Sequence, residues 1–441
     1  MALDRRLSRV SKILVDADDI GFPDAEARLK ALTLEIAIGP QATSPVAHAA
    51  ILTAVSVGSR TFAGGVKVTG SLDLPLKSCL PLAAKTIGGA ARLVGARTFD
   101  GPPRQRIEIG MGAENAVEGA LFPWWSGWRA GVDAHPRTGS DAGHNPLTGI
   151  AAGAMAVGAA FDAERGLKVT TDREIDLWPV SETETPPDFA EVFLPGALWM
   201  IGLGNLGQAY IWALASLPYE DPQKLELVLQ DRDRISEDNW GTSVLVHEEV
   251  FGQLKTKAAE AFTTARGFNV RRVDRRLLQN DRLEDDDPRM ALSGVDRVEA
   301  RKGMASTGFD CIIDAGLGRT ADQADRFRVT VFDQHSPIDR HFAKQEDEPK
   351  DEKILERDTY KELEADIGRC GASEIGGAST AVPYVSALAA AMAVARLIAV
   401  VSNCPCPENE VGRVSNLSKR RKAPSRSFSA RGASHAGHPT T

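Results

Sequence analysis

The chain contains a glycine-rich turn, Gly202-Leu203-Gly204-Asn205-Leu206-Gly207, whose residue types and spacing suit phosphate binding, and Asp231 follows 24 residues after its last glycine. An apolar run at residues 197–201 precedes the turn, and a helical pattern at residues 208–214 follows it. Glycines let the backbone turn tightly and approach a phosphate, while a helix N-terminus offers free N–H groups and a positive dipole. The acid suits hydrogen bonds from ribose hydroxyls. We therefore predict a nucleotide site formed by this turn and Asp231.

More polar residues follow Asp231 than a dehydrogenase needs for its dinucleotide. Asp233, Asn239 and Lys255 belong to the same strand–helix unit. Aspartate and asparagine can hold a ribose or a metal-bound phosphate, and lysine brings a point charge to phosphate oxygens. This set favours a nucleoside triphosphate over a nicotinamide dinucleotide, but an NAD-dependent oxidoreductase stays open as an alternative.

The elements that must position these residues alternate between strand and helix patterns. Strands are expected at residues 225–229, 268–273 and 309–314, and a helix at residues 245–264. Such alternation is typical of a parallel sheet, whose ligands bind at the carboxyl ends of the strands. Gly202, Asp231 and Asp314 should therefore converge at one edge of the sheet.

The order of these motifs resembles that of the ThiF/MoeB/HesA superfamily, the adenylating core of ubiquitin-activating enzymes. The resemblance covers roughly residues 194–401 and rests on Gly202, Gly204, Gly207, Asp231, Asp233, Asn239, Gly252 and Lys255. It implies a Rossmann-like fold that uses ATP and Mg²⁺. In particular, the chain is similar to activating enzymes of bacterial ubiquitin-like conjugation operons associated with phage defence. That similarity implies a ubiquitin-like protein and a conjugating enzyme as partners.

Two positions depart from the superfamily pattern. Where the superfamily has an Arg-Gln pair after the asparagine, this chain reads Asn239-Trp240-Gly241-Thr242-Ser243, so the usual phosphate-binding arginine is missing. The expected Thr-Asp-Asn after the third strand is also absent. The resemblance then assigns the magnesium-binding acid to Asp314, displaced by three positions, and Arg319 would supply the lost positive charge.

The resemblance implies a reaction in two parts. A carboxylate attacks the α-phosphorus of ATP, and Mg²⁺, Lys255 and the helix N-terminus stabilise the charge that develops. A thiol then captures the acyl-adenylate. Cys370 is the candidate nucleophile, because Arg369 and an exposed position would favour its thiolate. Adenylation of a sulfur-carrier protein or a peptide, without an enzyme thioester, is the alternative.

The first half of the chain looks like a worn copy of the second. Residues 146–157 align with residues 383–394 at six of twelve positions, and residues 107–113 read as a strand that ends in a Gly-x-Gly pair. We therefore predict an α/β protein in which a degenerate, inactive adenylation-like lobe precedes a Rossmann-like, parallel-sheet adenylation lobe, as in a pseudo-dimer. The expected boundaries are 1–180 for the inactive lobe, 181–193 for a linker, 194–403 for the active lobe with a crossover loop at about 340–380, and 404–441 for a tail.

Composition limits the other functional classes. The net charge of −8 argues against a nucleic-acid-binding body, and no uninterrupted apolar run of 18 residues or signal-peptide core is present, so we expect a cytoplasmic protein with no membrane partner. Five irregularly spaced cysteines are expected to be reduced thiols. The segment from 412 onward has seven Lys or Arg and no acid, which predicts a disordered basic tail. A homodimer and a non-catalytic scaffold stay open.

Overall fold

The computed structural model of the protein describes residues 3–137, 144–167, 173–178, 185–346, 352–380, 382–428 and 433–440. After residue 185 the main strands form one eight-stranded sheet in the order β10-β9-β8-β11-β12-β13-β15-β16. The first five in this order are parallel: β10 (Asn269–Val273), β9 (Glu226–Gln230), β8 (Ala197–Ile201), β11 (Met290–Ser293) and β12 (Cys311–Leu317). The rest are antiparallel: β13 (Arg326–Phe332), β15 (Asn409–Arg413) and β16 (Asn416–Lys422).

Helices form three of the four connections between the parallel strands, and the connection from β10 to β11, all of which the structure describes, contains no helix. The connecting helices are α6 (Asn205–Ser216), α7 (Lys255–Arg266) and α8 (Val298–Gly303). The strand expected at 197–201 matches β8, whereas the helix expected from residue 245 begins at Lys255. A short 3-10 turn, Glu248–Val250, occupies part of the difference.

The first half of the chain builds two smaller sheets. Parallel strands β1 (Thr33–Ile38), β2 (Gly65–Gly70) and β3 (Gln105–Ile109) pair in the order β2-β1-β3. Antiparallel strands β4 (Phe122–Ser126), β5 (Arg129–Asp133) and β6 (Arg173–Asp176) pair in the order β4-β5-β6. Their helices are α3 (Pro45–Thr61), α4 (Ile87–Leu93) and α5 (Pro146–Glu164). A parallel bridge between Ile107 and Leu121 joins the two sheets.

Six strands of the first half can be aligned in order with six of the eight strands in the large sheet. The series β2-β1-β3 and β4-β5-β6 corresponds to β9-β8-β11 and β12-β13-β15. A long helix that begins with proline precedes the last strand in each series, α5 in the first half and α11 (Pro383–Val401) in the second. In this alignment β1 is equivalent to β8, and β3 is equivalent to β11. The Gly110–Gly112 pair after β3 is therefore not the counterpart of the glycine turn after β8, because a 3-10 turn and then β4 follow it instead of a helix.

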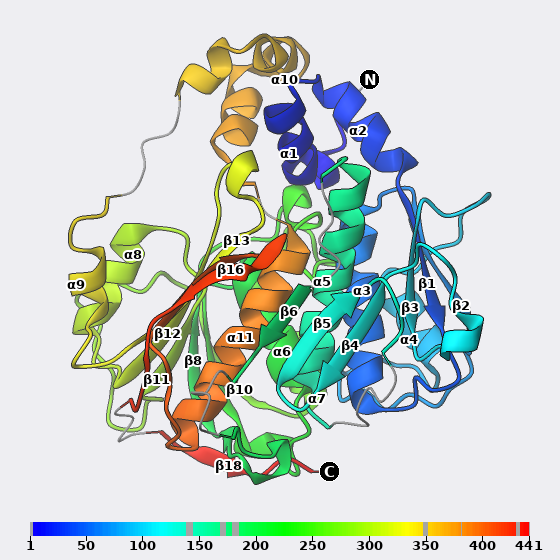
Figure 1. The fold of residues 1–441 in the computed structure, drawn as a ribbon. Coiled ribbons are helices and arrows are strands. Elements are labelled where there is room, and N and C mark those ends of the chain that lie inside the picture. The colour runs from blue at the N-terminus through cyan, green and yellow to red at the C-terminus, as the bar shows by residue number, and fades with distance from the viewer. Residues whose placement is uncertain are drawn as a thin grey trace.

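The core lies where α3, α5, α6 and α11 stand between the large sheet and the smaller ones (Figure 1). Helices α5 and α11 are long and apolar enough to cross a membrane, but 94% and 100% of their apolar windows are buried inside the protein. A hydrogen bond of 3.0 Å from Trp212 Nε1 to Thr53 Oγ1 joins α6 to α3. The two halves therefore share one core.

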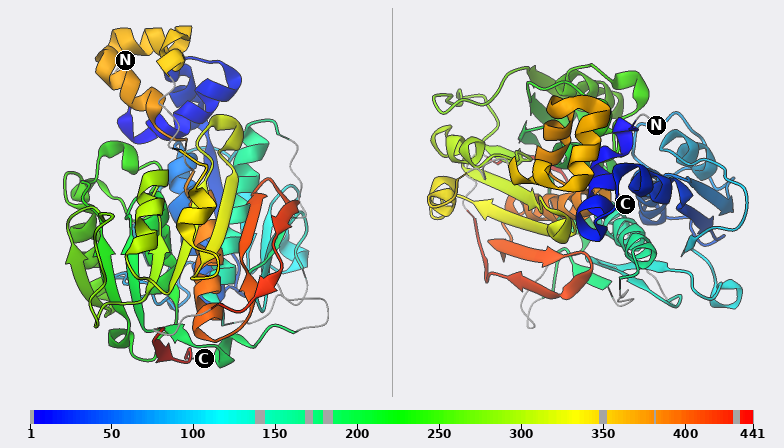
Figure 2. Two further views of the ribbon diagram at one scale, coloured as in Figure 1. Left: turned by 90° about the vertical axis from the view of Figure 1, so that its left-hand side faces the viewer. Right: turned by 90° about the horizontal axis from the view of Figure 1, so that it is seen from above.

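Three helices form a cap above both halves: α1 (Ser8–Asp18), α2 (Phe22–Ala31) and α10 (Asp358–Gly377), as Figures 1 and 2 show. Arg357 lies 3.0 Å from both Asp16 and Asp19, and the Tyr360 hydroxyl donates to Asp16 at 2.9 Å. The segment expected as a crossover loop thus contains α9 (Ile338–Phe342) and α10. Helix α10 is broken at Gly368, whose φ of 77° and ψ of 161° are not helical.

The expected disorder of residues 404–441 is wrong for most of that segment. β15 and β16 extend the large sheet, β14 (Cys406–Pro407) pairs with β17 (Ser425–Arg426), and β18 (His435–Gly437) pairs with β7 (Leu194–Pro195). Several of the basic side chains after residue 412 form ion pairs with acids that precede residue 412 in the chain. Glu410 lies 2.6 Å from Arg396 of α11 and 3.0 Å from Arg420 of β16.

The boundary between the halves falls partly outside the described residues, since these omit 179–184. Within the remainder of the expected linker, a 3-10 turn at Phe189–Glu191 packs the Phe189 ring 5.6 Å from that of Trp128. This part of the linker is therefore anchored to the first half.

Candidate nucleotide site

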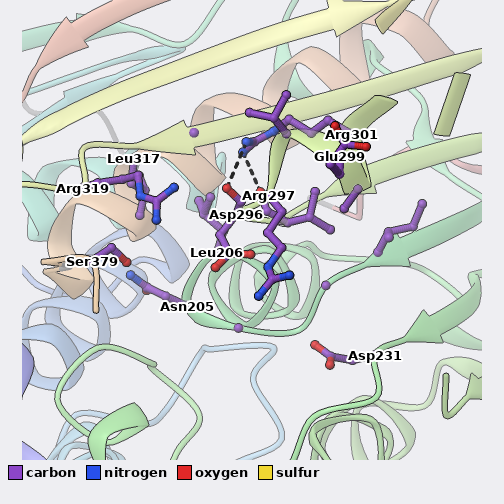
Figure 3. Close-up of a pocket in the computed structure, with 18 of the residues that line it drawn as sticks. Asn205, Leu206, Asp231, Asp296, Arg297, Glu299, Arg301, Leu317, Arg319 and Ser379 are labelled. Atoms are coloured by element: carbon purple, nitrogen blue, oxygen red, sulfur yellow. Dashed lines mark hydrogen bonds between the residues drawn. The ribbon is translucent and has the colours of Figure 1, made fainter. Parts of the chain in front are cut away.

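A cavity of about 1160 Å³ opens at the carboxyl ends of the parallel strands. The chain runs from β8 outward to β9 and β10 and then returns to β11 on the other side of β8. The gap between β8 and β11 is therefore the point at which the strand order reverses, where open α/β sheets bind ligands. Figure 3 shows side chains from several of these strand ends around the cavity.

The glycine turn has a conformation that requires its glycines. Gly202 has a φ of +82°, and a Cβ on Gly207 would lie 2.1 Å from the carbonyl oxygen of Gly202. A side chain at Gly207 would thus push α6 away from β8. Because α6 begins at Asn205, its first N–H groups face the cavity, as an anion site needs.

Asp231 lies directly against the glycine turn. Its carboxylate accepts the Leu203 N–H at 2.7 Å and the Asp233 N–H at 2.8 Å. Two charge-assisted bonds hold the side chain in one orientation at the end of β9, and its remaining lone pairs can accept from hydroxyl groups. The structure thus brings Asp231 and the turn together, as the sequence predicts.

The other predicted polar residues also line the cavity. Lys255, the first residue of α7, is 13% exposed, and its Nζ lies 3.3 Å from Asp233 Oδ2. Asn239 ends a 3-10 turn, and its Oδ1 accepts the Ser236 N–H at 3.1 Å. Asp233 therefore positions the lysine, while Asn239 keeps its amide NH₂ available to a ligand.

Residues of the first half support this wall of the cavity. Arg9 of α1 lines it and lies 2.6 Å from Asp238. Arg60 of α3 donates to the carbonyl oxygens of Ser243 at 3.0 Å and Val244 at 3.1 Å, and burial lowers the pKa of its guanidinium to about 10. The loop that carries Asn239 is thus held by both halves of the chain.

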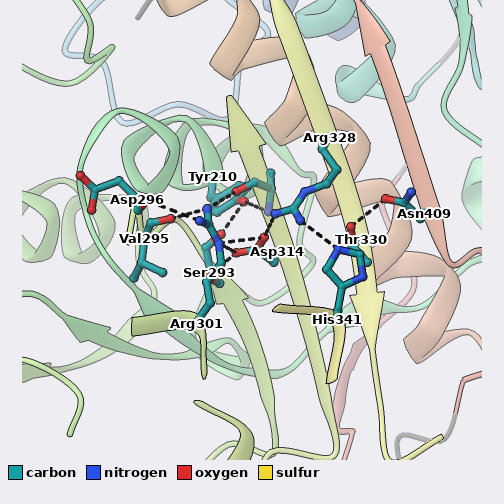
Figure 4. Close-up of polar contacts among 11 residues, drawn as sticks. Tyr210, Ser293, Val295, Asp296, Arg301, Asp314, Arg328, Thr330, His341 and Asn409 are labelled. Carbon is teal, nitrogen blue, oxygen red and sulfur yellow. Dashed lines mark hydrogen bonds and ion pairs between the residues drawn. The ribbon is translucent and has the colours of Figure 1, made fainter. Parts of the chain in front are cut away.

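Asp314 does not occupy the position that we assigned to a magnesium ligand. Its side chain is fully buried, accepts from Ser293 Oγ at 2.8 Å, and forms ion pairs with Arg301, at 3.0 Å, and Arg328 (Figure 4). Burial also lowers the pKa of Arg328. A cation would meet two guanidinium groups there, so the structure contradicts the assignment. The assignment failed because the sequence analysis did not predict the four-residue strand β11. This strand lies between β8 and β12, so Asp314 is one strand farther from the glycine turn than expected.

The acid that the cavity presents at the end of β11 is Asp296. Asp296 and Arg297 are exposed and extend from the turn between β11 and α8 toward the start of α6 (Figure 3). Sequence reasoning missed both, although the apolar residues 290–292, with Ser293 and Gly294 after them, could have marked a short strand end. Among the described residues, no group of three or more His, Cys, Asp or Glu side chains could hold a metal ion. A metal here would therefore need oxygens from a ligand.

Cys370 is exposed on the second half of α10 and is not among the cavity residues. Ser379 and Thr380, just beyond the end of α10, do line the cavity. Seven residues of helix, about 10 Å along its axis, lie between Cys370 and that end. Two other thiols are less suited to react, since burial raises the pKa of Cys311 and raises that of Cys406 to about 11.

Comparison with known proteins gives a consistent family for both halves. Residues 33–177 match the model of the BilD N-terminal domain, and residues 194–404 match that of the BilD C-terminal domain. The bacterial E1-like protein BilD of Collimonas sp. (strain OK412) is 31% identical over 409 residues, which cover 89% of this chain and 88% of that protein.

Similarity to solved structures is more remote. The crystal structure of E. coli MccB with ATP aligns with a TM-score of 0.32 and 15% identity, over 57% of this chain and 65% of that one, so the match spans just under two thirds of its length. The structure of E. coli MccB with succinimide aligns with a TM-score of 0.31 and 16% identity, over 55% of this chain and 67% of that one. Likeness at this level carries no inference about the site.

Proposed function

This chain belongs to the BilD family of bacterial E1-like proteins, and on that premise we propose that it uses ATP to adenylate the C-terminus of a ubiquitin-like protein. The observation that carries the proposal is the cavity at the strand reversal, which gathers the glycine turn, Asp231 and Lys255. Its volume of about 1160 Å³ exceeds the roughly 300–1,000 Å³ of ordinary small-molecule sites. Space therefore remains beside a nucleotide for the end of a protein chain.

In the proposed reaction, a carboxylate oxygen of the partner's C-terminus attacks the α-phosphorus of ATP. The bond from that phosphorus to the bridging oxygen breaks, so an acyl-adenylate forms and pyrophosphate leaves. Asp231 would orient the ribose, while Lys255 and the N–H groups at the start of α6 would stabilise the charge that grows on the phosphate oxygens. Loss of one such donor typically slows a reaction by about 10²–10³.

Mg²⁺ is part of this proposal as the ion that accompanies ATP. Asp296 would hold it, because the carboxylate is exposed in the cavity and pairs with no cation within 4 Å among the described residues. Magnesium sites for nucleotides commonly use one or two carboxylates together with phosphate oxygens and water. When bound, the ion would neutralise charge on the triphosphate.

We further propose that Cys370 receives the activated C-terminus. Its thiolate would attack the carbonyl carbon of the adenylate, a thioester would form, and AMP would leave. The helix break at Gly368 would allow the second half of α10 to bring Cys370 toward the cavity. A conjugating enzyme would then take the modifier from Cys370.

The first half of the chain is proposed to be an inactive copy of the second. Support comes from the shared strand order and from the turn after β1, where Gly39 is the only glycine before α3. A Cβ on Gly39 would lie 1.9 Å from the carbonyl oxygen of Gly110, so backbone fills the space that a phosphate would need. On this proposal one chain contains the pseudo-dimer, and a homodimer is not required. We also propose a cytoplasmic location.

Calorimetry with ATP·Mg²⁺ and with NAD tests the nucleotide class. Wild-type protein should bind ATP selectively, and Asp231→Ala should weaken that binding, because the variant loses the carboxylate at the glycine turn. Tight binding of NAD would instead return the site to the oxidoreductases. Absence of binding to either nucleotide would contradict the proposal and favour a scaffold.

Exchange of labelled pyrophosphate into ATP, measured with a candidate ubiquitin-like protein, tests the adenylation step. Cys370→Ser should retain this exchange and lose the thioester that a reducing agent cleaves. The matched control Cys404→Ser should retain both. Exchange without a thioester in the wild type would favour activation of a sulfur carrier or peptide.

A further inference from the structure

Four of the arginines that line the cavity form no ion pair with a described residue, and two of them, Arg297 and Arg319, lie near the start of α6. Arg9, Arg301 and Arg328 each lie within 4 Å of a carboxylate, whereas Arg297 and Arg319 form no ion pair with any described residue. Both are exposed to the cavity and come from different strand ends, Arg297 after β11 and Arg319 after β12. Figure 3 shows Arg319 above Asn205 and Arg297 on the far side of Leu206, near the start of α6.

A second observation at the same place points to a ligand. The side-chain oxygen and nitrogen of Asn205 are both buried and make no hydrogen bond with described residues. Buried polar groups in native proteins are rarely left without a partner. The amide lies at the N-terminus of α6 and lines the cavity, so an anion bound there would satisfy it.

The loop that would normally bring a cation to this site has another role here. The Trp240 ring, which directly follows Asn239 in this loop, lies 5.8 Å from the Arg6 guanidinium and 5.7 Å from that of Arg60. Gly241 packs against the N-terminal segment, since a Cβ there would lie 2.4 Å from the Arg6 carbonyl oxygen. This loop is therefore committed to contact with the first half and brings no side-chain cation of its own.

We propose that Arg297 and Arg319, together with the Asn205 amide at the start of α6, clamp the terminal phosphates of ATP. The proposal rests on the function proposed above and assigns the residues that replace the missing arginine. The order of strand ends supports it: Asp231 follows β9, the glycine turn follows β8, Arg297 follows β11 and Arg319 follows β12. With strands about 4.8 Å apart, a ribose at Asp231 leads the phosphates across the turn toward the two arginines.

Calorimetry on Arg297→Gln, Arg319→Gln and the double variant, with ATP·Mg²⁺, AMP and inorganic pyrophosphate as probes, tests the clamp. Each single variant should raise the dissociation constant for ATP by roughly 10-fold or more, as expected for a charge-assisted bond. AMP binding should change less than about twofold, because AMP lacks the terminal phosphates. Pyrophosphate should bind the wild type and lose affinity for the double variant.

Arg421→Gln is the matched control. Arg421 is exposed on β16, at the edge of the large sheet, lies outside the cavity and forms no ion pair with a described residue. ATP affinity should be nearly unchanged in this variant. Thermal unfolding of all variants without nucleotide should match the wild type, because the exchanged side chains are exposed and unpaired.

Three results would overturn the clamp. The first is that both single variants bind ATP as tightly as Arg421→Gln does. The second is that AMP affinity falls in parallel with ATP affinity, which would indicate a general loss of the site. If the wild type binds no ATP, the proposed function fails together with the clamp. Tight wild-type binding with unaffected variants would instead overturn the clamp alone.

Discussion

Replacing Asp314 by asparagine should destabilise the protein strongly, because the side chain neutralises two buried arginines. Asp314 is 0% exposed, and its partners Arg301 and Arg328 are 9% and 19% exposed. The substitution keeps the volume and removes the charge. Removal of one partner from a buried ion pair costs about 3–5 kcal/mol, since the other charge stays buried without compensation. We expect the free energy of unfolding to fall by that amount.

Urea unfolding followed by tryptophan fluorescence measures this change. With a slope of roughly 3 kcal/mol per molar urea, the midpoint should fall by roughly 1–1.7 M. Asp296→Asn is the matched control, because it makes the same chemical change on an exposed cavity acid. The free energy of unfolding of Asp296→Asn should stay within about 0.5 kcal/mol of the wild-type value. Its affinity for ATP should depend less on Mg²⁺.

The opposite pattern would refute this reasoning. If Asp314→Asn unfolded at the wild-type urea concentration and lost the magnesium dependence of ATP binding, Asp314 would be the metal ligand after all. The ion pairs of Asp314 with Arg301 and Arg328 would then not form in solution.

Three further predictions concern other parts of the molecule. Gly207→Ala should cost about 1–3 kcal/mol and abolish ATP binding in calorimetry, because its Cβ would lie 2.1 Å from a carbonyl oxygen; Gly303→Ala, outside the cavity and with no atom within 4 Å of its Cβ, should bind nearly normally. Burial lowers the pKa of His48 from 6.5 to about 4, so His48 is protonated at higher pH in the unfolded chain than in the folded protein. The free energy of unfolding should therefore fall by about 3 kcal/mol through His48 as the pH drops from 6.5 to 4. In urea titrations at several pH values, His48→Gln should lack this part of the pH dependence. Glu410→Gln should cost about 3 kcal/mol in urea unfolding, because Arg396 is only 2% exposed, and an unchanged midpoint would indicate that the tail strands do not form.

Local pattern was sufficient for the elements nearest the nucleotide. The strand at 197–201, the glycine turn and the following helix were predicted from residues adjacent in sequence, and Asp231 proved to lie against the turn. These features depend on backbone conformations that particular residue types require, such as the positive φ of Gly202.

Non-local pairing limited the rest of the prediction. The tail from 404 looked disordered because its own segment lacks acids beyond residue 410, but Glu410 and Arg396 stabilise it from within the fold. Composition describes a segment in isolation, and it cannot show which buried charge elsewhere in the chain will pair with that segment.

The sequence by itself therefore determined the type of site: a phosphate-binding turn with a ribose acid and a lysine, because those requirements are local. Only the tertiary structure decided which acid faces the cavity. Strand order places Asp296 at the reversal beside β8 and moves Asp314 one strand away, between Arg301 and Arg328. Strand order arises from hydrogen bonds between residues far apart in sequence, and four-residue β11 carries too little pattern of its own to reveal it.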